Sequence, residues 1–98
     1  MKIYHNIEQN KKVEFVDDVV EAILADGFRD GYMDAVWFSD KPIACEVNGF
    51  TGVAVEVPAA VDLTQYEQRD DGLRDEGFTT YAIPAGVVNA WPLEQHWL

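Results

Sequence analysis

One stretch of this chain carries a strong helical pattern, and this pattern constrains the fold more than any other feature. Its hydrophobic residues recur at spacings of three, one, three and one, as in the buried stripe of an amphipathic helix; they are Val16, Val19, Val20, Ile23 and Leu24. Acidic residues occupy the other faces. Gly27 follows the stripe and is a natural stop, because glycine adopts the left-handed conformation that ends many helices. The pattern therefore predicts one main helix with one buried face.

Short runs rich in β-branched and aromatic residues lie on both sides of this helix, and Pro or Gly ends most of them. The expected strands are 2–5, 35–39, a hairpin over 43–57 that turns at Asn48-Gly49, 79–83 with a continuation at 87–89, and the tail 91–98. The polar segment 63–76 is expected to be a mobile loop. The order predicts an α+β fold, with one main amphipathic helix packed on a mostly antiparallel, twisted sheet.

The length and composition predict one domain over residues 1–98, with enough apolar residues for a core without metal or disulfides. Cys45 is the single cysteine, so it has no internal disulfide partner and is expected to be a small buried hydrophobe. The first residues lack the apolar core of a signal peptide, and no apolar run approaches the roughly 20 residues that span a bilayer. We therefore expect a cytoplasmic location and no membrane partner.

Two histidines are present, and their spacing does not predict a metal site. His5 and His96 have no ligand-like spacing to each other or to Cys45, and no glycine-rich phosphate loop occurs. His5 ends the first expected strand, next to Asn6. Its simplest interpretation is a strand-end histidine that a backbone carbonyl satisfies. We therefore expect no metal and no cofactor.

Several short motifs stand out along the chain: Tyr4-His5-Asn6, Asp26-Gly27-Phe28-Arg29-Asp30-Gly31, Val36-Trp37-Phe38-Ser39-Asp40-Lys41-Pro42, Val53-Ala54-Val55-Glu56-Val57-Pro58 and residues 81–89. Together they resemble small bacterial and phage proteins of ADP-ribosyltransferase-like fold. In active members of that group, the first-strand His and the aromatic-Ser strand help to hold the nicotinamide dinucleotide. The resemblance implies that His5 and Ser39 would take these roles, with NAD as the cofactor.

The chain departs from the resemblance at the catalytic carboxylate. Active members carry a Glu near the start of a late strand, where it polarises the ribose, and the matching position falls near Thr80. A threonine cannot stabilise an oxocarbenium-like centre as a carboxylate does. Glu76 lies four residues earlier and would need the loop to fold back. The resemblance thus implies the fold, while an ADP-ribosyltransferase that modifies a protein or nucleic-acid target is the alternative function.

Charge is the unusual property of this sequence, with 18 acidic against 7 basic residues and a net charge of −11. Such a charge argues against direct binding of nucleic acid or of an anionic membrane. The acids gather on the expected helix and in the segment before the late strand. The predicted partner-binding residues are Asp17, Asp18, Glu21, Asp70, Asp71, Asp75 and Glu76.

Two kinds of explanation fit this acidic surface. A rigid row of carboxylates can stand in for nucleic-acid phosphates and occupy a Lys- and Arg-rich groove. By size and charge the chain is similar to acidic DNA-mimic anti-CRISPR proteins of phages, which implies a basic nucleic-acid-binding protein or CRISPR effector complex as the partner. The simpler explanation is a charge that aids solubility, or one that is incidental in an antitoxin-like or housekeeping interaction protein.

Overall fold

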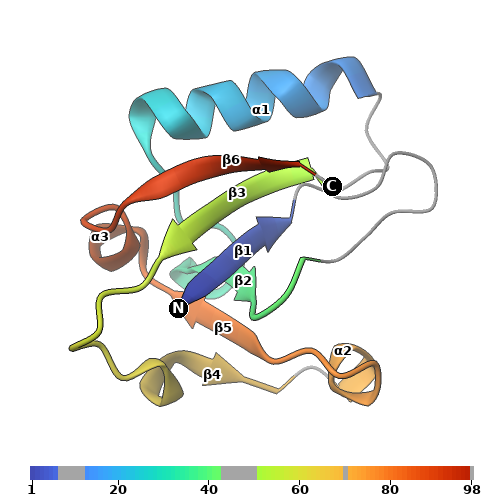
Figure 1. Cartoon of the computed structure of the whole chain (residues 1–98), viewed down its shortest axis with the longest axis vertical. Helices are drawn as coiled ribbons and strands as arrows, with labels where there is room; N and C mark the ends of the chain where they lie inside the picture. Colours follow the sequence, from blue (N-terminus) through green and yellow to red (C-terminus); the bar gives the residue numbers. More distant parts are fainter. Residues whose placement is uncertain (7–12, 43–50, 70, 98) are drawn as a thin grey trace.

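The computed structural model describes residues 1–6, 13–42, 51–69 and 71–97. These residues form a six-stranded antiparallel sheet with strand order β4-β5-β2-β1-β3-β6 (Figure 1). The strands are β1 (Lys2–Asn6), β2 (Val36–Ser39), β3 (Thr51–Glu56), β4 (Glu67–Gln68), β5 (Thr80–Ile83) and β6 (Leu93–Trp97). The helices are α1 (Val13–Asp26), α2 (Asp71–Asp75) and α3 (Ala85–Val88), with 3-10 turns η1 (Tyr32–Asp34) and η2 (Leu63–Tyr66). The predicted α+β class is confirmed.

The core lies on one face of the sheet. Successive strand residues point to opposite faces, and the register places the apolar residues of neighbouring strands opposite one another. The buried strand residues of this face are Ile3, Val36, Phe38, Val53, Val55, Tyr81 and Ile83. The other buried members of the cluster are Val20 of α1, Phe28, Val57, Leu63 of η2, Ala85 and Val88 of α3, and Trp91. The alternation of apolar and polar residues therefore determines which face of the sheet receives the helices.

The helix α1 follows the predicted stripe in its centre and departs from it near its end. Val20 is 1% exposed and Ile23 packs against the core, while the side chains of Val16 and Val19 lie outside the described part of the structure. The prediction that Leu24 is buried is wrong, since it is 42% exposed. Successive helical residues are about 100° apart, so the burial of Ile23 turns Leu24 toward the edge of the stripe.

α1 ends where the sequence predicts, just before Gly27. Gly27 has φ of 83°, and its amide donates to the carbonyl of Ile23 at 2.8 Å. α1 begins at Val13, before the first apolar residue of the predicted stripe, so the two aspartates Asp17 and Asp18 lie in its second turn. The helix dipole acts mainly within the first turn, so it contributes little to the stability of these two aspartates in α1.

The expected hairpin over 43–57 does not describe the sheet around β3. One edge of β3 pairs with β1 and the other with β6, so neither edge is left for a hairpin arm. The turn at Asn48-Gly49 lies outside the described residues. β6 itself confirms the strand predicted in the tail.

Two other segments differ from the prediction. Residues 87–89 were expected as a strand, but the structure has the short helix α3 there, with Asn89 as its C-cap. Pro84 starts this helix, since its carbonyl accepts from the amides of Val87 and Val88 at 2.9 and 3.1 Å. The segment expected to be a loop contains η2, β4 and α2. Asp62 is the N-cap of η2, because its carboxylate accepts a hydrogen bond from the amide of Thr64 at 3.0 Å.

Side-chain bonds join the segment after α1 to α3. The Asn89 amide accepts from the Phe28 N–H at 2.7 Å and donates to the Phe28 carbonyl at 3.0 Å. Asp30 accepts from the amide of Ala85 at 2.8 Å. A Cβ at Gly27 would lie 2.9 Å from Oδ1 of Asn89, in a backbone conformation that already disfavours other residues. Glycine is therefore required where this segment passes α3.

We predict that Val20→Asp lowers the free energy of unfolding by about 3 kcal/mol or more, because it removes apolar burial and places a carboxylate in the core. Leu24→Asp is the matched control on the same helix, and we expect a change within about 0.5 kcal/mol. Urea unfolding followed by circular dichroism measures both. Equal losses in the two variants would show that the helix is placed incorrectly.

We predict that Asn89→Ala lowers the free energy of unfolding by about 1–3 kcal/mol, because both hydrogen bonds to Phe28 are lost. Asn89→Asp keeps an acceptor for the Phe28 N–H but loses the donor, so its loss should be smaller at neutral pH. Thermal unfolding of the two variants beside the wild type tests this order. A larger loss of unfolding free energy for Asn89→Asp than for Asn89→Ala would contradict the pair of hydrogen bonds between Asn89 and Phe28.

Candidate functional site

His5 lies on the core face of the sheet and is held in one orientation. Its Nδ1 is 2.8 Å from the carbonyl oxygen of Trp37. Since a carbonyl oxygen only accepts, Nδ1 is the donor and carries the proton. The ring makes edge contacts with Phe28 and Phe38, at centroid distances of 5.2 and 5.8 Å. The sequence-based interpretation of His5 as a strand-end histidine satisfied by a backbone carbonyl is confirmed.

A hollow of about 360 Å³ opens beside His5 at the end of α1. It is lined by His5, Ala22, Ile23, Asp26, Gly27, Phe28, Arg29 and Val36. Burial lowers the pKa of His5 below its ordinary value of 6.5, and this effect outweighs the opposing bond to Trp37. The imidazole that faces this hollow is therefore neutral at pH 7, with Nδ1 occupied.

Ser39 lies on the other face of the sheet. It follows Phe38, which contacts His5, so the alternation of the strand turns the two side chains to opposite faces. Ser39 is 1% exposed, donates to the carbonyl of Lys41 at 2.7 Å and accepts from Nδ2 of Asn6 at 2.8 Å. The structure does not bring together the two side chains that the transferase resemblance implies.

Thr80 stands beside Ser39 in the register of β2 and β5 and is buried. Its hydroxyl donates to the carbonyl of Gln68 at 2.6 Å, so it joins β5 to β4. The position that the resemblance assigns to the catalytic carboxylate therefore holds a hydroxyl with a structural bond. Glu76, the substitute considered in the sequence, is exposed after the end of α2.

The predicted acidic surface is divided between two ends of the molecule. Figure 1 shows α1 on the β6 side of the sheet, where it contacts β3 and β6, and α2 near the β4 edge, along the longest dimension of 36 Å. Asp17, Asp18 and Glu21 belong to α1; Asp71 and Asp75 belong to α2, Glu76 follows it, and Asp70 lies outside the described residues. The two predicted clusters therefore do not form one continuous row.

Other acidic residues have structural partners that the sequence did not reveal. Asp40 accepts from the amide of Thr79 at 2.9 Å, and Glu56 pairs with the N-terminal amine at 3.3 Å. Lys2 pairs with Glu94 across β3. Hydrogen bonds from Thr64 lower the pKa of the Asp62 carboxyl. Together with Asp30, these residues account for part of the negative charge, and only the cap of Asp62 had a local sequence signal.

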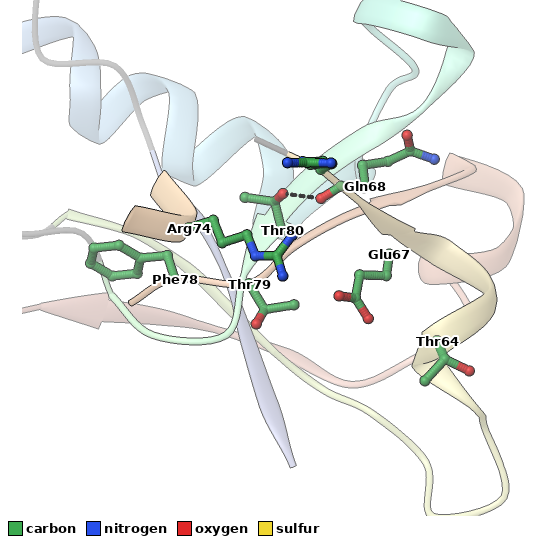
Figure 2. Close-up of a pocket in the computed structure, with 8 residues that line it drawn as sticks. Thr64, Glu67, Gln68, Arg74, Phe78, Thr79 and Thr80 are labelled. Carbon is green, nitrogen blue, oxygen red and sulfur yellow. Dashed lines mark hydrogen bonds between the residues drawn. The ribbon is translucent and has the colours of Figure 1, made fainter. Parts of the chain in front are cut away.

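A second hollow, of about 520 Å³, lies between β4, α2 and the start of β5 (Figure 2). It is lined by Thr64, Glu67, Gln68, Arg69, Arg74, Phe78, Thr79 and Thr80. Two of the three arginines of the chain line this hollow. The sequence analysis did not identify Arg69 and Arg74 as site residues, because the pairing of β4 with β5 that creates the hollow has no local sequence signal.

In the part of the chain that the structure describes, no group of three or more His, Cys, Asp or Glu residues could hold a metal ion. Within the same ranges, no helix has the length and apolar character needed to cross a membrane. Cys45 is outside the described residues. Comparison with known protein families, with characterised proteins and with solved structures found no match to this chain. The likeness to ADP-ribosyltransferase-like proteins therefore rests on the short motifs alone.

We predict that His5 makes the protein less stable as pH falls below 6.5. Its folded-state pKa is lowered, so the unfolded chain binds the proton more readily, and stability rises with pH between the folded pKa and 6.5. One proton gives a slope of at most about 1.4 kcal/mol per pH unit. Urea titrations of wild type between pH 5 and 7.5 measure it.

His5→Asn is the control, since its amide keeps a donor near Nδ1 but does not titrate. The difference in unfolding free energy between wild type and His5→Asn should be constant above pH 7 and should shift against the wild type as pH falls. A difference that does not change with pH would contradict a buried, neutral His5.

Proposed function

We propose that this protein binds the basic nucleic-acid-binding surface of a partner protein or complex through α1 and so takes the place of nucleic acid there. The supporting observation is the charge of the helix. Acidic residues stand at positions i, i+3, i+4 and i+7 of α1, a spacing that repeats on one side of a helix; they are Glu14, Asp17, Asp18 and Glu21. No Lys or Arg occurs among the 14 residues of α1.

The charge density of this row resembles that of a nucleic-acid strand. A helix rises about 1.5 Å per residue, so the four acids of α1 extend over about 10 Å. One strand of duplex DNA carries a phosphate for about every 3.4 Å of axis, which gives four phosphates over the same length. A groove with Lys and Arg placed for successive phosphates would therefore meet a similar number of negative charges on α1.

We propose that the partner contacts the end of the molecule that carries α1 rather than the end that carries α2. α2 has five residues, and Arg74 lies within it, while Arg69 lies just before it. These cations reduce the negative charge of that end. The two ends lie at opposite edges of the sheet, so one groove is expected to contact one of them. A nucleic-acid-binding effector complex, such as a CRISPR effector, is the class of partner that this arrangement suits.

The remaining negative charge assists the approach to such a partner. A net charge of −11 produces a field that steers the protein toward a positive surface and raises the association rate. Salt screens charges separated by more than about 8 Å at physiological ionic strength. The association rate should therefore fall as salt is added, while the dissociation rate changes less.

We predict that reversing Asp17, Asp18 and Glu21 to Lys slows association with such a partner by about tenfold or more, since the charges that face the groove change sign. The matched control reverses Asp71, Asp75 and Glu76 to Lys. Each reversal adds two positive charges, so both variants carry a net charge of −5. Biolayer interferometry against a panel of nucleic-acid-binding complexes, at several salt concentrations and with competing DNA, measures both rates.

The comparison of the two variants separates local from general charge effects. The proposal expects the α1 variant to lose most of its association rate and the α2 variant to retain most of it. Equal rates for both variants, or capture that competing DNA does not reduce, would leave the acidic surface as an aid to solubility. Circular dichroism of each variant confirms that the domain remains folded.

A further inference from the structure

We propose that the hollow between β4, α2 and β5 binds a small zwitterion, an α-amino acid with a free ammonium and a free carboxylate. This site is separate from the acidic row of α1, because α1 and β4 lie at opposite ends of the molecule. Its volume of about 520 Å³ falls within the range of small-molecule sites, about 300–1,000 Å³.

Opposite charges enter this hollow from two sides without pairing. Figure 2 shows Arg74 reaching in from α2, and Glu67 placed on β4 across from it. Both side chains are exposed, and neither has a hydrogen-bond or ion-pair partner among the described residues. A cation and an anion that face one hollow but do not contact each other match the two charged groups of an amino acid.

Arg74 suits the carboxylate of such a ligand. The guanidinium group is planar and binds a carboxylate through two parallel hydrogen bonds. Arg69 lines the same hollow and adds a second positive charge. Two arginines and one glutamate give the lining a net charge of +1 in a chain whose net charge is −11.

Glu67 suits the ammonium group, and two threonine hydroxyls of the lining act only as acceptors toward a ligand. The Thr64 hydroxyl donates to the Asp62 carboxylate at 2.6 Å, and the Thr80 hydroxyl donates to the Gln68 carbonyl at 2.6 Å. Because each hydroxyl has a single proton, both oxygens offer only lone pairs to a ligand. Such acceptors match the N–H donors of an ammonium group, whereas a phosphate would need donors at these positions.

The charge of the whole protein also favours a zwitterion over an anion. An amino acid carries no net charge at neutral pH, so the field of the acidic chain does not repel it from a distance. A phosphate dianion would approach against that field. Phe78 lines the hollow and is half-buried, so it offers an apolar wall for the ligand side chain. We therefore expect apolar or aromatic amino acids to bind best.

Isothermal titration calorimetry of the full chain with single amino acids tests the proposal, with heteronuclear NMR shifts of Thr79 and Thr80 as the location readout. Saturable binding of an apolar or aromatic amino acid is expected. The N-acetylated amino acid and the amino-acid amide each lack one charge, and each should bind at least about tenfold more weakly. Arg74→Gln and Glu67→Gln should weaken binding of the amino acid to a similar degree.

Two exposed residues outside the hollow provide matched controls. Arg29→Gln removes the third arginine, and Asp34→Asn removes a carboxylate at a position whose φ of 54° suits Asn. Both should bind the amino acid as the wild type does. Acetate or inorganic phosphate binding as tightly as the amino acid would overturn the proposal in favour of a simple anion site. Absence of saturable binding by any amino acid in the folded protein would also overturn it.

Discussion

The turn that leaves α1 is fixed by side-chain bonds to α3, and much of the interior depends on it. Asn89 bonds both polar groups of the Phe28 backbone, as a neighbouring strand would do. This places the Phe28 ring against His5 and Phe38, while Gly27 passes close to the Asn89 amide. The polar interaction therefore determines how the apolar core closes at this end of the sheet.

The fold class and most strands could be predicted from the sequence because their signals are local. The stripe around Val20, the stop at Gly27 and the apolar tail each predicted an element that the structure contains. The segment after Pro84 was mispredicted, since Val87 and Val88 favour strands while the carbonyl of Pro84 starts a helix. The burial of Leu24 was mispredicted because five apolar positions exceed the stripe that the sheet covers.

The candidate sites were harder to predict because they depend on which strands pair. The orientation of His5 requires the Trp37 carbonyl, and the separation of His5 from Ser39 follows from the alternation of two paired strands. The second hollow joins Thr64, Arg74 and Thr80, which only the pairing of β4 with β5 and the position of α2 bring together. The residue types alone predicted an acidic surface. They did not predict that its acidic residues lie in two clusters at opposite ends of the molecule.

The sheet order has a consequence for how the chain is made. β3 lies between β1, which precedes it by more than forty residues in the chain, and β6, which follows it by more than thirty. β2 and β5 also pair across a long separation. The ion pair of Lys2 with Glu94 joins residues 92 positions apart. Long-range pairing of this kind slows folding. The sheet closes only after residues through Trp97 have left the ribosome, and until then the edge of β3 that pairs with β6 has no partner strand.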